Sequence, residues 1–355
     1  MRFWWRLKEK PCHMLCSTLI LLTFFYLFAT VLVHNNGRIS TNDVVSGGTT
    51  DVDHFLKLVV AKYGAHIILE NITLEDGSLI WIADFISFDP IEQTRGARLN
   101  AYRIIQAPQI KSTNKGLAIH SVFRLKLPTE LSQSNLDTSK WKIDHGYLIL
   151  HTYYHLCAEI MFYCDGVKLS RESDAAVLSL GLGGGMLHGF LRHHFPKMNI
   201  TSVEISARVA NVASKWFDLK LDDRHSLIIT DGVKFVEEQA LKGTKYDAIS
   251  LDACYSKSSG RICPVKAFLN EKVIRSLSRL VKIEGIIIVN TIVEGSVEEN
   301  SSPMELFSRF FRYCYSRKSK THNDVLYCMH QRPSKEKNVD LLEFIERTPL
   351  MSRSI

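Results

Sequence analysis

The sequence predicts an α/β fold with a doubly wound, mostly parallel sheet, preceded by a small β-rich domain and one N-terminal transmembrane helix. Three observations support this. Strand-like and helix-like segments alternate after residue 175, a glycine-rich junction follows the first of these strands, and an uncharged apolar stretch lies near the N-terminus. Buried parallel strands read as nearly continuous apolar runs that helices connect. With 355 residues and 46% hydrophobic content, the chain is long enough to bury a sizeable core.

The apolar stretch covers residues 14–34 and follows a basic segment at residues 1–13. It is long enough to span a hydrocarbon core of about 30 Å, and we interpret it as a signal anchor. The positive-inside rule then makes residues 1–13 a cytosolic tail and predicts a single-pass type II membrane protein of the ER or Golgi with a luminal C-terminal domain. A cleaved secretory signal, with cleavage near Ala29, remains the alternative.

Two domains are expected after the apolar stretch. Residues 35–53 are polar and read as a linker or stem. Residues 54–145 contain short β-rich runs such as HIILENITL and SLIWIADFISF, separated by turn residues, and predict a small antiparallel domain. Residues 146–335 are the second domain, and residues 336–355 are a C-terminal tail.

Strand-like and helix-like segments alternate in the second domain. Five apolar strands, AAVLSL, ITSVEI, SLIIT, YDAISLD and GIIIVN, are separated by amphipathic helical segments. The last two strand-like runs, FRYCYS and DVLYCMH, predict a C-terminal antiparallel hairpin. A parallel sheet covered by helices on both faces, with the hairpin at its edge, accounts for this order.

Four glycines lie at the first strand-to-helix junction, GLGGG: Gly181, Gly183, Gly184 and Gly185. In a doubly wound sheet this turn lies at the carboxyl ends of the strands, where ligands bind. Its bare backbone can lie against a ligand, and the next helix presents its positive N-terminus. The alternative is a turn that is merely tight.

Acidic residues end the next three strands. Glu204 lies 23 residues after Gly181, where a carboxylate can accept both hydroxyls of a ribose. Asp231, followed by Gly232, can accept from an adenine amino group, and Asp252 faces the same crevice. Any one of these acids could simply cap a helix, but three in consecutive units favour a site. The ligand we expect carries adenosine without a pyrophosphate.

Residues 145–330 resemble the spermidine synthase-like branch of the class I S-adenosylmethionine-dependent methyltransferases. In particular they resemble the C-terminal domain of the methyltransferase-like proteins that modify elongation factor 1-alpha. The motifs are LGLGGGML, HHFP, VEIS, VASKWF, DGVKFV, YDAISLD, CPVKAFL and EGIIIVN. The resemblance implies a seven-stranded Rossmann-like methyltransferase sheet and S-adenosylmethionine as cofactor. It also implies contacts to that cofactor from Gly181, Gly183, Glu204, Asp231 and Gly232.

Departures from this family favour methyl transfer over aminopropyl transfer. Polyamine synthases carry an acid directly after the glycines, where this chain has Met186. They also carry a second aspartate in the loop after the fourth strand, where this chain follows Asp252 with Ala-Cys-Tyr-Ser. Asp252, with Tyr154 or Tyr255, is therefore expected to orient or deprotonate the acceptor. Tyr154 and His155 resemble the Tyr-His pair that lines the acceptor side in polyamine synthases.

The leading hypothesis is a membrane-anchored methyltransferase acting on an unknown acceptor, a protein amine or a small molecule. The alternatives are a catalytically silent relative with a binding or structural role and, third, a polyamine synthase. The net charge of +7 is spread along the chain, and its densest cluster is the short run SRKSK. We therefore expect no nucleic-acid partner. No metal site is expected, and a homodimer is left open.

Cysteines and sequons would fit a luminal domain. Six cysteines follow the apolar stretch and permit disulfides, for example Cys314–Cys328 across the hairpin. Sequons at Asn71 and Asn300 are expected in loops and predict a glycoprotein. The sequon at Asn199 would open a central strand and is expected to stay unmodified.

Overall fold

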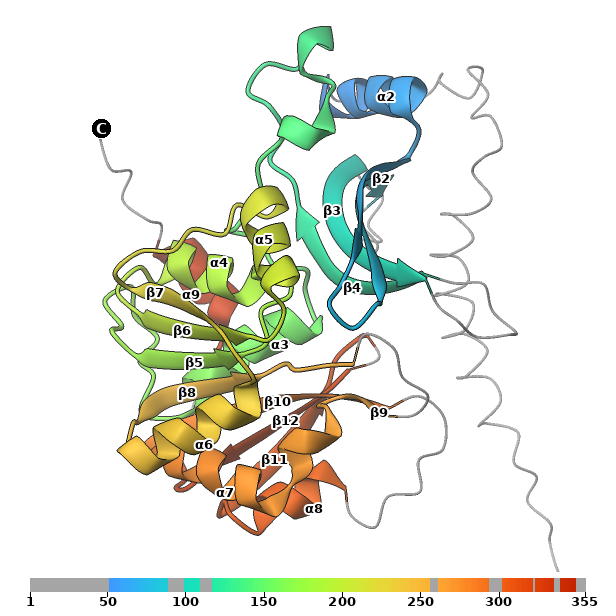
Figure 1. Ribbon diagram of the computed structural model, residues 1–355. Helices are drawn as coiled ribbons and strands as arrows, with labels where there is room; N and C mark the ends of the chain where they lie inside the picture. The colour runs from blue at the N-terminus through green and yellow to red at the C-terminus, as the bar shows by residue number, and fades with distance from the viewer. Residues whose placement is uncertain are drawn as a thin grey trace, which may run out of the picture.

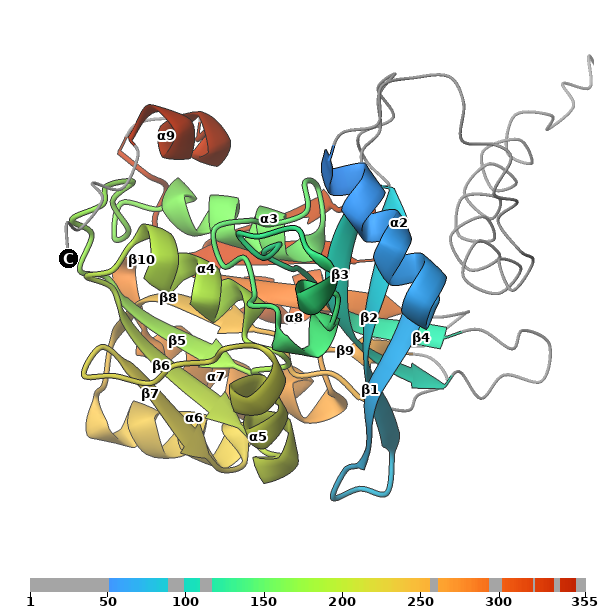
Figure 2. The same ribbon diagram turned by 90° about the horizontal axis from the view of Figure 1, so that it is seen from above.

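The computed structural model describes residues 51–88, 99–108, 117–255, 261–293, 302–321, 323–334 and 339–348. Two sheets organise this part of the chain, a small antiparallel one and a large, mostly parallel one (Figure 1). Figure 2 shows the small sheet standing beside the large one, with helix α2 on its outer side.

The small sheet has four strands in the order β1-β2-β3-β4, each antiparallel to its neighbour. Phe55, Leu56 and Val59 of helix α2 are buried in its core. This helix starts within the segment expected to be a linker, because its apolar residues recur at helical spacing and two aspartates begin it. The elements are α2 (Asp51–Tyr63), β1 (His66–Thr73), β2 (Leu79–Phe88), β3 (Leu99–Pro108) and β4 (Leu117–Arg124).

The large sheet has the order β11-β12-β10-β8-β5-β6-β7, and the short strand β9 pairs with β10. The five strands expected to be parallel are parallel, and the C-terminal hairpin forms the antiparallel edge. The strand order reverses at β5, so the glycine turn after β5 lies at the switch point. The strands are β5 (Ala176–Leu180), β6 (Asn199–Glu204), β7 (His225–Ile229), β8 (Tyr246–Leu251), β9 (Arg261–Cys263), β10 (Val281–Val293), β11 (Tyr313–Lys318) and β12 (Asp324–Met329).

Helices cover both faces of this sheet (Figure 1). Alternate residues of β10 show the two faces: Ile286 and Ile288 enter one core, and Ile287 and Val289 enter the other. One face carries α3 (Tyr153–Ile160), α4 (Met186–His194), α5 (Ala207–Trp216) and, outside them, α9 (Leu341–Arg347). The other carries α6 (Gly232–Lys242), α7 (Glu271–Leu280) and α8 (Pro303–Ser308). Short 3₁₀ turns lie at Gln133–Asn135, Thr138–Lys140, Met161–Tyr163 and Lys266–Leu269.

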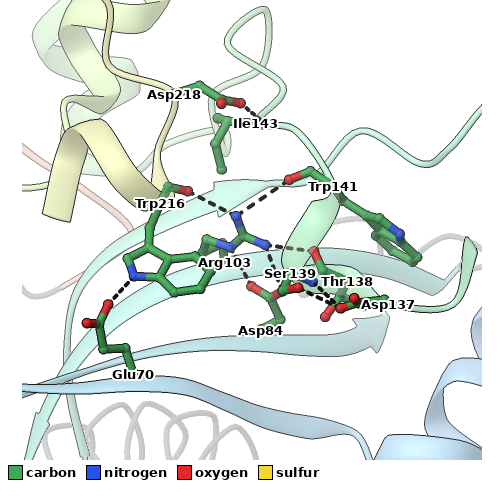
Figure 3. A network of polar contacts seen from close by, with 10 residues as sticks. All are labelled: Glu70, Asp84, Arg103, Asp137, Thr138, Ser139, Trp141, Ile143, Trp216 and Asp218. Atoms are coloured by element: carbon green, nitrogen blue, oxygen red, sulfur yellow. Dashed lines mark hydrogen bonds and ion pairs between the residues drawn. The ribbon is translucent and has the colours of Figure 1, made fainter.

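A buried arginine joins the small sheet to helix α5 (Figure 3). Arg103 of β3 donates to both carboxylate oxygens of Asp84, at 2.7 and 2.9 Å. The same guanidinium donates to the carbonyl oxygens of Thr138 and of Trp216, the last residue of α5. Trp216 in turn donates its indole N–H to Glu70 of β1. These contacts fix the small sheet against the helix that follows β6.

The prediction of a transmembrane helix at residues 14–34 is corrected. The described part of the chain holds no helix of the length and apolarity needed to cross a bilayer. Its longest helix, α2, has 13 residues and so spans about 20 Å, against about 30 Å of hydrocarbon. Residues 14–34 themselves lie outside the described residues. The membrane anchor is withdrawn, and with it the type II luminal placement in the ER or Golgi.

One predicted disulfide is confirmed. Cys314 and Cys328 face each other across β11 and β12 and are bonded. Asn71 lies within strand β1 rather than in a loop, and Asn199 opens β6 as expected. Asn300 lies outside the described residues, and glycosylation stays a prediction.

Candidate active site

In the turn between β5 and α4, glycine is required by the backbone conformation and by close approaches within the protein itself. Gly181, Gly183 and Gly185 have φ values of 98°, 53° and 80°, in the left-handed region that favours glycine. A Cβ on Gly181 would lie 2.3 Å from the carbonyl oxygen of Asp252. A Cβ on Gly184 would lie 2.6 Å from the ring of Phe123 of β4. The turn therefore holds the end of β8 on one side and the small sheet on the other.

Glu204, at the end of β6, connects the glycine turn to the next helix. Its side chain is buried, and one carboxylate oxygen accepts from the backbone N–H of Leu182 at 3.0 Å. The other oxygen accepts from the N–H of Ser206, the N-cap of α5, at 2.9 Å. Burial raises the pKa of Glu204, while these backbone hydrogen bonds oppose the shift. A carboxylate has about four acceptor positions, so further hydrogen-bond donors can still bind here.

Asp231 is exposed and caps helix α6. Its carboxylate accepts from the N–H groups of Val233 and Lys234, at 2.7 and 3.2 Å. Gly232 packs against Phe268, because a Cβ there would lie 2.9 Å from the phenylalanine ring. Capping alone explains Asp231 structurally, and its contact with a ligand stays a prediction.

Asp252 follows β8 and lies beside Gly181. Asn290 of β10 donates its side-chain N–H to the carboxylate at 2.6 Å, and Asn323 in turn donates to Asn290 at 2.8 Å. Burial raises the pKa of Asp252 to about 6, against hydrogen bonds from Asn290 and Tyr154 that lower it. A carboxyl group with this pKa is a proton acceptor near neutral pH.

The structure brings Tyr154 and Asp252 to one cavity. They line it together with Gly181 and His188, and its volume of about 10 Å³ holds about one water. Burial and the charge of Asp252 raise the pKa of Tyr154, so its hydroxyl stays protonated. Tyr255 does not line this cavity; its ring is exposed and its hydroxyl accepts from the backbone N–H of Lys266.

Residues 164–316 match the model of the spermine/spermidine synthase domain. These residues form a spermidine synthase-like domain. The relationship predicted from the sequence is thereby confirmed.

The spermidine synthase-like domain is similar to the eEF1A lysine and N-terminal methyltransferase homolog of Drosophila melanogaster, with 28% identity over 195 residues. That alignment covers 55% of this chain but only 29% of the relative. A crystal structure of human methyltransferase-like protein 13 in complex with SAH shares 27% identity over 56% of this chain and 93% of that chain, with a TM-score of 0.49. A probable spermidine synthase from Corynebacterium glutamicum has 14% identity, a TM-score of 0.50, and covers 79% of this chain and 85% of its own. The similarity to this spermidine synthase shows a shared fold and no more.

A second disulfide lies beside Asp252, in the segment that follows β8. Cys254, two residues after Asp252, is bonded to Cys263 of β9. The sulfur of Cys254 lies 3.4 Å from a carboxylate oxygen of Asp252. The disulfide therefore holds Cys254, next to Asp252, against strand β9.

Sequence reasoning missed several residues of this site. Asn290 ends the apolar run GIIIVN in the sequence, the same signal that singled out the three acids, although strand β10 continues to Val293. Ile205 directly follows Glu204, and its side chain is 71% exposed at the carboxyl edge of the sheet. Phe123 and Ser121 come to the glycine turn from the small sheet, and no local pattern indicates that contact.

Proposed function

We propose that this protein is an S-adenosylmethionine-dependent methyltransferase whose acceptor is an amino group of a protein. The observation that carries the proposal is the row of groups at the switch point of the sheet. A bare glycine turn, the buried Glu204 and the proton acceptor Asp252 lie at the carboxyl ends of three adjacent strands. Ligands bind at that edge in doubly wound sheets.

The residues present fit the cofactor. Gly185 is the N-cap of helix α4. No side chain caps the first turn of this helix and no acid lies within that turn, so its N–H groups suit the methionine carboxylate. Glu204 can accept from the ribose hydroxyls. The exposed Ile205 beside it offers an apolar surface for adenine. Met186, where polyamine synthases carry an acid, leaves the position uncharged and favours the carboxylated cofactor.

When bound, the cofactor supplies an electrophilic methyl group on a sulfonium, which needs only an aligned nucleophile. The residues of this chain then orient the acceptor and remove its proton. Asp252 accepts the proton of the attacking amine, because its pKa of about 6 leaves it ionised at neutral pH. Tyr154 stays a neutral donor and fixes the carboxylate. Asn290 holds the other side of that carboxylate.

A protein acceptor is favoured by the names of the similar proteins. The Drosophila relative is named for methylation of eEF1A at lysine and at the N-terminus. This chain covers under a third of that relative, so eEF1A is one substrate to test among others.

The test is methyl transfer from labelled cofactor to a cell extract and to purified eEF1A. Labelled protein is expected with wild type and not with Asp252→Asn. Spermidine formed from decarboxylated cofactor and putrescine would instead identify a polyamine synthase. Labelling that is equal in the two proteins would reject the assigned role of Asp252.

One observation favours a catalytically silent relative. Phe123 and Phe217 pack with ring centroids 4.6 Å apart, and both lie against Gly184 of the turn. If they close the cofactor site permanently, the protein binds no S-adenosylmethionine at millimolar concentration. Binding of the cofactor without any labelled acceptor in the extract would also support the silent relative.

A further inference from the structure

The turn between β1 and β2 of the small sheet reaches the start of helix α5 (Figure 2). Glu75 lies in this turn. One oxygen of its carboxylate accepts from the hydroxyl group of Ser206 at 2.6 Å, and the other accepts from the backbone N–H of Arg208 at 3.1 Å. Ser206 is the N-cap of α5, so a side chain 131 positions earlier in the sequence completes the cap of this helix.

The same contacts continue to Glu204, the residue we assign to the ribose of the cofactor. The backbone N–H of Ser206 donates to one carboxylate oxygen of Glu204 at 2.9 Å, and the N–H of Leu182 in the glycine turn donates to the other. Ser206 is buried, and its hydroxyl oxygen accepts from the N–H of Val209 at 3.0 Å. Ser206 is therefore held by its own helix and by Glu75, and it holds Glu204 in turn.

The turn that carries Glu75 is itself held in place. The backbone N–H of Leu74 donates to the carbonyl oxygen of Ser78 at 2.7 Å and closes the turn. The guanidinium group of Arg208 donates to the carbonyl oxygen of Thr73, the last residue of β1. The carboxylate of Glu75 is therefore presented to α5 from a fixed backbone.

The geometry points to Glu75 as a positioning residue for the cofactor. It fixes Ser206 and thereby orients the carboxylate of Glu204 toward the ribose hydroxyls. This inference rests on the proposed function, which assigns the ribose of S-adenosylmethionine to Glu204. A carboxylate that is already held in its binding orientation loses less conformational freedom when the ligand arrives, so the small sheet contributes to cofactor affinity.

The electrostatic effect of Glu75 on Glu204 has the opposite sign. Burial raises the pKa of Glu204, and the nearby charge of Glu75 adds to the rise. Removing that charge leaves Glu204 more fully ionised and a better acceptor for the ribose hydroxyls. Weaker cofactor binding after Glu75→Ala therefore reports the loss of positioning and not the loss of charge.

Glu70 of β1 provides a matched control at the other end of α5. Its carboxylate accepts from the ammonium group of Lys215 at 2.8 Å and from the indole N–H of Trp216. Helix α5 has 10 residues, so its two ends lie about 15 Å apart. Each glutamate makes two hydrogen bonds to this helix, but only Glu75 makes them next to Glu204.

Calorimetry with S-adenosylmethionine on the full chain compares these variants. Glu75→Ala should bind the cofactor about tenfold more weakly. Its rate at saturating cofactor should change by less than about twofold, because Asp252 and Tyr154 are not involved. Glu75→Gln keeps one acceptor oxygen and should have an intermediate affinity. Glu70→Ala should bind within about twofold of wild type, whatever it loses in melting temperature. Wild-type affinity in Glu75→Ala, or an equal loss in Glu70→Ala, would overturn the inference.

A double-mutant cycle tests the coupling to Glu204. In the Glu204→Gln background, adding Glu75→Ala should change the affinity by less than about twofold, because the carboxylate that Glu75 positions is already gone. An undiminished loss in the double variant would show that Glu75 acts elsewhere. If wild type binds no S-adenosylmethionine, the proposed function fails and this inference fails with it. If wild type binds and either comparison fails, the inference alone is refuted.

Discussion

Replacing Asp252 by asparagine should stabilise the protein while it removes activity. Burial raises the pKa of this carboxyl group from 3.8 to about 6, so the folded state holds its proton more tightly than the unfolded state. The stability gained from that proton is fully present below pH 3.8 and is lost as the pH rises through about 6. The change in pKa corresponds to about 3 kcal/mol, of which we expect about 2 kcal/mol in practice because part of the side chain remains accessible.

Urea denaturation of wild type and Asp252→Asn at about pH 8 and about pH 4 measures this difference. The variant should be about 2 kcal/mol more stable at the higher pH and nearly equal at the lower one. Its rate of methyl transfer should fall by about 100-fold or more, and the wild-type rate should fall below about pH 6. Asp231→Asn is the control, since asparagine also caps a helix and should change stability little. A destabilised or fully active Asp252→Asn would refute this account of the carboxyl group.

Three other changes test the surroundings of the site. Arg103→Leu leaves its carboxylate partner buried and unpaired, so the free energy of unfolding should fall by about 3–5 kcal/mol in urea; a loss below about 1 kcal/mol would contradict the role of this ion pair. Gly184→Ala places a Cβ against the ring of Phe123 and should cost about 1–3 kcal/mol, a loss that Phe123→Leu should partly restore if the contact is the cause. Replacing Cys254 and Cys263 by serine should lower the rate of methyl transfer, because this disulfide lies beside Asp252. Replacing Cys314 and Cys328 in the hairpin should mainly lower the melting temperature. Equal effects of the two changes on the rate would contradict a role for the Cys254–Cys263 disulfide.

The parallel part of the large sheet could be predicted from the sequence because each of its five strands is an apolar run and helical segments connect them. The start of helix α2 could not, since its polar residues resemble those of the segment before it, and its apolar face is defined by packing on the small sheet. The hydropathy of residues 14–34 predicted a membrane helix. The described residues contain no helix of that length and apolarity, and residues 14–34 themselves lie outside them.

Site residues could be predicted from the sequence where a polar residue directly ends an apolar, strand-like run. Glu204 and Asp252 were found in this way. Asn290 ends an apolar run in the same manner but lies within strand β10. The packing of Phe123 against Gly184 was not predictable, because Phe123 lies about 60 residues earlier in the sequence and belongs to the small sheet. For the same reason the sequence could not separate the roles of neighbouring residues on α3, where Tyr154 and His155 line different cavities.

Calorimetric titration of the full chain with S-adenosylmethionine tests the central claim most directly. The account predicts saturable binding, a preference over decarboxylated S-adenosylmethionine, and a loss of affinity of about tenfold or more in Glu204→Gln. No heat of binding at millimolar ligand, or a preference for the decarboxylated form, would contradict it.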